Sequence, residues 1–486
     1  MWLFVKPTVS DCNRRDTLRA STGASHFLAK VAALPPSPLT PALPVGEGET
    51  PLRVGVLNEC NIAERRDAWL PLPREGRGEG EEPSLGPSAH KMRCAPCQLP
   101  EFCQLHFSAC DFSIPAMPKF PAPLDLKQVK VYPLASRKSM AAIEDILVKP
   151  ESPPPAPPND FIRDRIALCA QQIKAAQARG ATVMFLYGAH LVKNGAQAIL
   201  ERLMDGGWIT HLATNGAGSI HDWEFAFQNW STESVEQNVA TGTFGTWDET
   251  GRNIHLALLA GGLRDEGYGV ALGRFITEDG VTLPPAAKLE TLLRNEPAHP
   301  LAPARADLLQ AMREHKLPSG RIEVKHPWKH TSIFGNAFRH GIPMTVHPGI
   351  GYDIISNHPM FNGAVIGRAA GFDFRLFGTA VEGLDEGVVL SVGSAIMAPQ
   401  VFEKSLSCVN NLRLQAGRKI VQGHNIYVVD LQDGGNWDWT KGEPPKETPA
   451  YYLRFCKSFS RMHGAMHYLQ CDNVAFAHNL LRQLES

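Results

Sequence analysis

Residues 181–222 constrain the fold of this chain more than any other part of the sequence. A short apolar run at 182–187, bounded by glycines, is typical of a buried parallel strand. We expect a helix at 195–204 and a second strand at 209–213, followed by a glycine-rich turn at 214–219. A helix that opens near the end of this turn would direct free backbone N–H groups at whatever lies above it.

This order of strand, helix, strand, turn and helix is the arrangement that holds nucleotide phosphates in dinucleotide-binding proteins. The glycines do not follow the GxGxxG spacing, however. The pattern is therefore equally compatible with a tight turn in an α/β domain that binds no ligand.

The composition of the chain changes near residue 117. The preceding segment is rich in proline and in glycine–charge phrases, and it shows no helical or strand period. We expect residues 1–116 to be a disordered N-terminal tail or a misassigned extension, with the start of translation at Met117. Residues 117–160 then form a lead-in with a proline-rich linker, and 161–486 form the folded domain.

The overall composition excludes several classes of function. The net charge is −1, and no apolar run approaches the roughly 20 residues that a membrane span requires. We therefore expect no nucleic-acid partner, no membrane and a cytoplasmic location. Four cysteines of the folded part are dispersed among apolar residues and resemble reduced core thiols, namely Cys169, Cys408, Cys456 and Cys471.

Further strands are expected at 342–346, 388–392 and 425–431, separated by helices. This alternation predicts an α/β fold with a doubly wound, mostly parallel, Rossmann-like sheet. The strands end in loops of Gly, Asp, His, Asn and Ser at 347–353, 393–394 and 432–439. Because ligands of such sheets lie over the carboxyl ends of the strands, these loops indicate a shared binding site.

Four segments of the chain resemble the deoxyhypusine synthase family. They are FLYGAHLVKNG at 185–195, ATNGAGSIHD at 213–222, HGIPMTVHPGIGYD at 340–353, and the proline-to-lysine spacing of Pro449 and Lys457. They occur in the family's order, and the resemblance covers most of 181–484. The chain departs from the family's pattern at His221, Phe455 and Cys456.

The resemblance implies an NAD-dependent enzyme with active sites between the subunits of a homo-oligomer, a tetramer in that family. It implies oxidation of spermidine or a related polyamine, capture of the aminobutyl group as an imine on Lys457, and transfer to an acceptor amine. The acceptor would be a protein lysine or a small amine. The residues implied to bind NAD are His190, Gly195, Thr214, Asn215, Gly216, Asp353, Gly393, Ser394, Asp472 and Asn473.

A polyamine cation needs carboxylates and aromatic faces around it. Asp433, Trp437, Asp438 and Trp439 offer both within seven residues, so we predict that they bind the substrate. The alternative is a solvated loop whose tryptophans pack back on the domain.

The sequence is also compatible with two other functions. His221, Asp222, His347, Asp353 and His358 could supply ligands to the metal of a hydrolase, although no HxH or HExxH spacing occurs. The chain could also be a non-catalytic NAD-binding protein that retains the fold.

Overall fold

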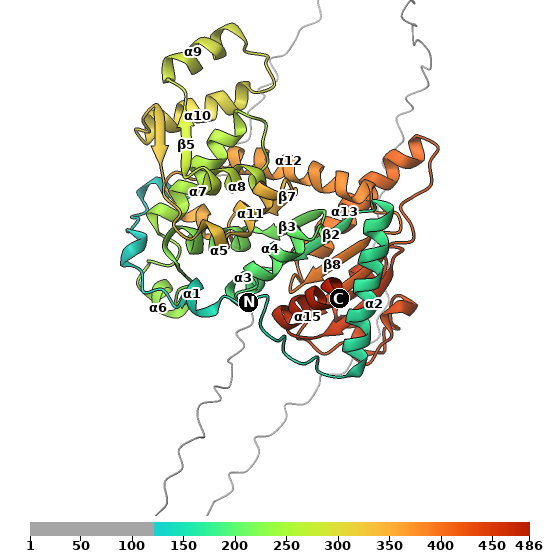
Figure 1. Cartoon of the computed structure of the whole chain (residues 1–486). Coiled ribbons are helices and arrows are strands. Elements are labelled where there is room, and N and C mark those ends of the chain that lie inside the picture. The colour runs from blue at the N-terminus through green and yellow to red at the C-terminus, as the bar shows by residue number, and fades with distance from the viewer. Residues whose placement is uncertain (1–120) are drawn as a thin grey trace, which may run out of the picture. The chain divides into compact units, whose positions relative to one another are not determined.

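Six parallel strands form the central sheet of residues 121–486, the part of the chain that the computed structural model describes (Figure 1). Our expectations for residues 1–116 lie outside these residues. In sheet order the strands are β10 (Ala465–Gln470), β9 (Asn425–Asp430), β8 (Val388–Val392), β2 (Val183–Tyr187), β3 (His211–Asn215) and β7 (Met344–His347). Along the chain, β2 comes first, β3 and β7 are then added on one side of it, and β8, β9 and β10 are added on the other side.

This order confirms the predicted doubly wound, Rossmann-like α/β fold. The strand order reverses between β2 and β8, which are direct neighbours in the sheet. All six strands run parallel, so their carboxyl ends meet at one edge. The reversal point therefore lies at the middle of that edge.

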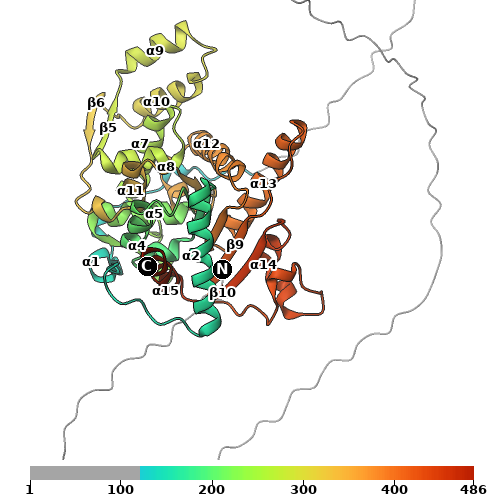
Figure 2. The ribbon, with the colours of Figure 1, turned by 45° about the vertical axis from the view of Figure 1, so that its right-hand side comes forward.

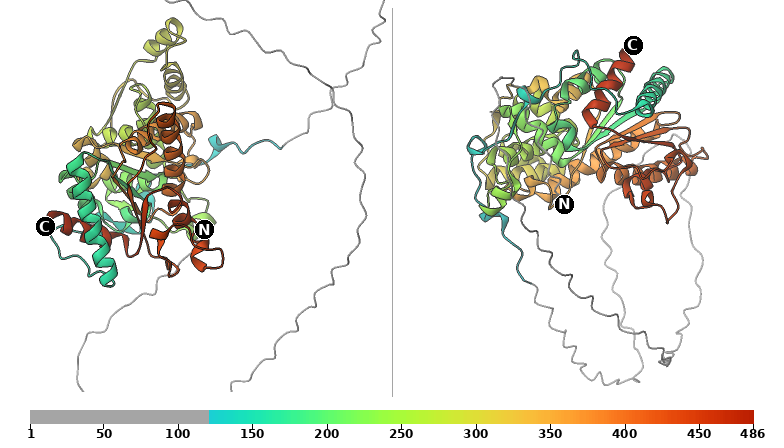
Figure 3. Two further views of the ribbon diagram at one scale, coloured as in Figure 1. Left: turned by 90° about the vertical axis from the view of Figure 1, so that its right-hand side faces the viewer. Right: turned by 90° about the horizontal axis from the view of Figure 1, so that it is seen from below.

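Both faces of the sheet are buried, because alternate side chains of each central strand enter different cores. In β2, Val183, Phe185 and Tyr187 join one apolar cluster, whereas Met184 and Leu186 join the other. The first face carries α2 (Asp160–Arg179), α4 (Gln197–Asp205), α11 (Ile333–His340) and α15 (Asn473–Glu485). The second face carries α12 (Gly363–Glu382), α13 (Met397–Gln415) and α14 (Arg454–Phe459), and Figure 3 shows both layers.

A helical extension is inserted between β3 and β7 (Figure 2). It consists of α7 (Asp248–Gly262), α8 (Tyr268–Thr277), α9 (Ala286–Asn295) and α10 (Ala302–Glu314), with the hairpin β5 (Gly280–Leu283) and β6 (Gly320–Glu323). The lead-in adds α1 (Ile143–Ile146), and β1 (Ala141–Ala142) pairs with β4 (Trp230–Ser231), which precedes α6 (Val235–Ala240).

Two local expectations near the central unit need correction. The helix expected at 195–204 is α4, which begins at Gln197, and a further short helix that was not expected, α3 (Ala189–Lys193), precedes it; Gly195 separates the two with a positive φ of 83°. The helix expected near Ser219 is α5 (Gly216–Gln228), which begins three residues earlier because the Asn215 side chain caps it.

The edge strand β10 is not apparent in the sequence. Its residues include His467 and Gln470, and they do not form an apolar run. The strand exists because it pairs with β9 over its full length. Among the described residues, no helix has both the length and the apolar character needed to cross a membrane.

Candidate functional site

Two glycines mark the point where the strand order reverses. Gly188 follows β2 and Gly393 follows β8, and a Cβ atom on Gly188 would lie 2.1 Å from the carbonyl oxygen of Gly393. The Gly188 N–H also donates to the carbonyl of Val392 at 3.2 Å. Only glycine permits this approach of two strand ends, and the crevice of a doubly wound sheet lies above such a point.

The turn after β3 lies beside this point. The Thr214 hydroxyl donates to the carbonyl of Tyr187 at 2.9 Å, which ties the end of β3 to the end of β2. The Asn215 side-chain oxygen accepts from the N–H of Gly218 at 2.9 Å. Gly216, the first residue of α5, lies against the carboxylate of Asp353, since a Cβ there would be 2.0 Å from Oδ2. The structure therefore brings Thr214, Asn215, Gly216 and Asp353 together.

Asp353 reaches this position from the loop after β7. Its Oδ2 accepts from the N–H of Gly349 at 2.8 Å. Burial raises the pKa of this carboxyl to about 6, and the Gly349 hydrogen bond opposes that rise. An acid thus faces the start of α5 at the edge where the strands end.

The start of α15 lies at the end of β8. Asp472 caps this helix and accepts from the N–H groups of Val474 and Ala475, each at 3.0 Å. Gly393 has a φ of 61°, and a Cβ on it would lie 2.3 Å from the amide nitrogen of Asn473. The amide oxygen of Asn473 is buried without a partner among the described residues. Such an atom is satisfied most readily by water or a ligand.

Three further residues are implied to bind the cofactor, namely Ser394, His190 and Gly195. Ser394 accepts from the N–H of Ala398 at 3.3 Å and remains at the end of β8. His190 lies in the first turn of α3, the helix that begins one residue after Gly188. Gly195 instead contacts the lead-in, because its Cβ would meet the carbonyl oxygen of Ile146 at 1.9 Å. This close packing against the lead-in accounts for the glycine at position 195.

A cavity of about 540 Å³ lies beside the ends of β9 and β10. Its lining includes all four residues predicted to bind substrate, Asp433, Trp437, Asp438 and Trp439. Both indole N–H groups bond within their own loop, at 2.9 and 3.3 Å, so the tryptophans also pack back as the alternative expected. Arg165 of α2 and Tyr468 of β10 line the same cavity.

Lys457 lies apart from this cavity, on α14. Its Nζ is 3.5 Å from Oε1 of Glu443 and 3.3 Å from the centre of the Tyr451 ring. Lys457 thus lies between a carboxylate and an aromatic ring, and it does not line the cavity.

The structure does not assemble the metal ligands that a hydrolase would need. The carboxylate of Asp222 caps α11, accepting from the Ser332 hydroxyl at 2.5 Å and the Ile333 N–H at 2.8 Å. His358 faces Asp248 at 3.4 Å, and His347 bonds to Thr345 at 3.3 Å. Within residues 121–486, no group of three His, Cys, Asp or Glu residues could hold a metal ion.

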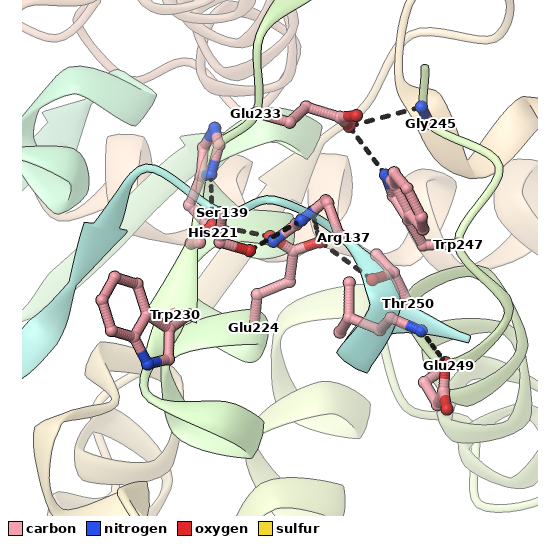
Figure 4. Close-up of polar contacts among 12 residues, drawn as sticks. Arg137, Ser139, His221, Glu224, Trp230, Glu233, Gly245, Trp247, Glu249 and Thr250 are labelled. Atoms are coloured by element: carbon pink, nitrogen blue, oxygen red, sulfur yellow. Dashed lines mark hydrogen bonds and ion pairs between the residues drawn. The ribbon is translucent and has the colours of Figure 1, made fainter. Parts of the chain in front are cut away.

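Sequence reasoning did not identify a buried polar network around α5 (Figure 4). In it, Arg137 pairs with Glu224, Glu224 accepts from Ser231, and Ser231 contacts His221. The only signal in the sequence was the dense set of polar residues in SIHDWE at 219–224. The partners Arg137 and Ser231 come from other elements, so spacing could not reveal them.

Comparisons with known proteins give similarities of structure alone. No protein-family profile matches the chain, and no curated protein matches it. It is similar to AgrE solved with ornithine and NAD⁺, with 12% identity and a TM-score of 0.34, over 68% of this chain and 34% of AgrE. It is similar to ArgZ, an arginine dihydrolase from cyanobacteria, with 11% identity and a TM-score of 0.30, over 66% and 32%.

A LOR/SDH protein from Methanococcus maripaludis S2 is also similar, with 13% identity and a TM-score of 0.33, over 73% of this chain and 76% of that one. The chain spans about a third of the length of AgrE and of ArgZ.

Proposed function

We propose that this chain is an NAD-dependent enzyme whose cofactor lies across the carboxyl ends of β3, β2 and β8. The observation that carries the proposal is the contact of Gly188 with Gly393 at the reversal point of the sheet. Dinucleotides bind in the crevice outside such points, where glycines let the backbone approach the ligand closely.

The residues around this point fit a dinucleotide. Asp353, beside Gly216 at the end of β3, is placed to accept from a ribose hydroxyl. The unpartnered amide oxygen of Asn473, at the end of β8, can accept a hydrogen bond from a bound group. When bound, NAD would supply hydride acceptance, and the protein would supply orientation and exclusion of water.

We further propose that the cavity beside β9 and β10 binds a cationic amine substrate. Asp433 and Asp438 provide negative charge, and Trp437 provides an aromatic face. On the resemblance to deoxyhypusine synthases, the reaction would be aminobutyl transfer from spermidine to an acceptor amine through a lysine imine. The cavity supports this proposal, whereas the ion pair of Lys457 with Glu443 does not.

Calorimetric titration of the full chain with NAD⁺ tests the cofactor. We expect saturable binding that Asn473→Ala weakens, because that change removes the unsatisfied acceptor. Asn411→Ala, at an exposed position on the distant part of α13, is the matched control. The absence of NAD⁺ binding by a folded protein would reject the proposal.

Borohydride trapping with spermidine and NAD⁺, followed by mapping of the labelled lysine, tests the finer reaction. A label on Lys457 would support the lysine imine. Saturable NAD⁺ binding without any label or turnover of amines would indicate a non-catalytic NAD-binding protein instead.

A further inference from the structure

The buried pair of Arg137 and Glu224 anchors a chain of hydrogen bonds that ends at His221. Both nitrogens Nη1 and Nη2 of Arg137 lie 2.8 Å from the two carboxylate oxygens of Glu224, and each side chain is 1% exposed. Thr250 donates to the same carboxylate at 2.9 Å. Arg137 lowers the pKa of Glu224 despite its burial, so the carboxylate is ionised and can only accept hydrogen bonds.

This carboxylate determines which ring nitrogen of His221 carries the proton. Ser231 Oγ lies 2.6 Å from Glu224 Oε2, and it must donate its single proton there. It can therefore only accept from Nδ1 of His221, at 2.8 Å. The imidazole is held with its proton on Nδ1, which leaves the lone pair on Nε2 as an acceptor.

The Nε2 atom has no hydrogen-bond partner among the described residues, and His221 is only partly buried. A base that is oriented by a second group, with its reactive nitrogen free, is the arrangement used for proton acceptance. Burial lowers the pKa of His221 to about 4, Glu224 opposes this, and Lys193, Arg137 and His190 reinforce it. The ring is therefore neutral near pH 7, which keeps Nε2 available.

Lys193 supplies a cation on the neighbouring helix. It is the last residue of α3, which packs against α5, the helix that carries His221. The side chain is half-buried, and no hydrogen bond or ion pair of its Nζ occurs within residues 121–486. Partial burial lowers its pKa. This ammonium is therefore open to an anionic ligand.

We propose that His221 and Lys193 form a binding site for a small organic acid that carries a hydroxyl or amino group beside its carboxylate. Nε2 of His221 accepts from the hydroxyl or amino group, and Nζ of Lys193 binds the carboxylate. One acceptor beside one cation matches this combination. A phosphate dianion would require several donors around its charged oxygens, whereas this site offers one cation. Binding at this site requires no bound NAD.

Lysine modification tests the site directly, without any enzymatic activity. The full chain is treated with trinitrobenzenesulfonate at neutral pH, and the rate at Lys193 is measured by peptide mass spectrometry. The panel of protecting ligands contains the natural amino acids, lactate, malate, acetate and inorganic phosphate. We expect at least one 2-amino or 2-hydroxy acid to protect Lys193, while acetate and phosphate do not. Because free amino acids also consume the reagent, the rate at Lys193 is divided by that at the exposed Lys288, and only a bound ligand should lower this ratio.

Two variants separate this role from a structural one. His221→Phe should weaken the protecting ligand about tenfold, because it removes the oriented acceptor. Ser231→Ala, which leaves His221 in place but frees its tautomer, should weaken it less and should shift the pH profile of protection. Protection of Lys193 by phosphate or acetate alone would overturn the proposal, as would no protection by any acid. An unchanged affinity in a folded His221→Phe variant would also overturn it.

Discussion

Arg137 forms a two-point ion pair with Glu224 in which both N···O distances are 2.8 Å and both side chains are excluded from solvent. The pair joins the lead-in segment to α5, the helix that opens beside the end of β3. Arg137 also lies 5.7 Å from the Trp247 ring, so the lead-in contacts α7 as well. The described part of the lead-in, from residue 121 to residue 160, thus belongs to the packed structure around α5.

Removing one partner of this pair should be strongly destabilising. Arg137→Met would leave Glu224 ionised and uncompensated in the interior, at a cost of about 3–5 kcal/mol in the free energy of unfolding. Urea unfolding of the variant measures this cost. The matched control is Arg163→Met, which removes the exposed pair with Asp160 and should cost less than about 1 kcal/mol. Equal losses in the two variants would contradict the role of burial.

A methyl group at the reversal point should separate β2 from β8. Gly188→Ala places a Cβ 2.1 Å from the Gly393 carbonyl oxygen, so the strand ends must move. We expect a loss of about 1–3 kcal/mol in stability and weaker NAD⁺ binding. Gly371→Ala, in the exposed interior of α12 with open space around the new methyl group, should instead stabilise by about 0.5–1 kcal/mol. Thermal unfolding and calorimetry of both variants check these opposite signs.

Asp373 should make stability decrease as the pH rises. Burial raises its pKa to about 8, and the N–H groups of Gly269 and Val346 only partly oppose this. The native state therefore retains a proton that the unfolded chain releases near pH 4. Between about pH 4 and pH 8 this group removes up to roughly 1.4 kcal/mol of stability per pH unit.

Asp373→Asn cannot titrate, so its stability relative to the wild-type protein should rise over the same interval. Urea unfolding at about pH 5 and pH 8 measures the difference between the two proteins. The same difference at both pH values would show that Asp373 does not titrate in this range.

Asp433 and Asp438, which line the cavity beside β9 and β10, should strengthen binding of a cationic amine. Asp433→Asn with Asp438→Asn should weaken spermidine binding about five- to tenfold at low salt, and the effect should shrink in high salt. Glu447→Gln, which changes an exposed charge that does not line the cavity, is the control. If all three proteins bind spermidine equally, the cavity is not the amine site.

Several elements of the fold were predictable because their residues carry a local signal. The strands β2 and β8 are short apolar runs bounded by glycine, and α2 has a clear amphipathic period, so each was placed within a residue or two. The polar loops after the strands predicted that Asp353 and Gly216 lie at one edge of the sheet, and they are in contact. Strand β10 carried no such signal, because its stability comes from pairing with β9.

The sequence by itself determined the α/β class, the edge of the sheet at which the polar loops meet, and the loop that lines the cavity beside β9 and β10. These follow from local periodicity and from the rule that parallel strands end together. Only the tertiary structure decided that Asp222 caps α11, that Lys457 faces Glu443, and that His221 ends a chain of bonds from Arg137. Neighbouring side chains on a helix point in different directions, and Arg137 lies 87 residues from its partner Glu224 along the chain. Those pairings depend on packing between elements, which no local pattern encodes.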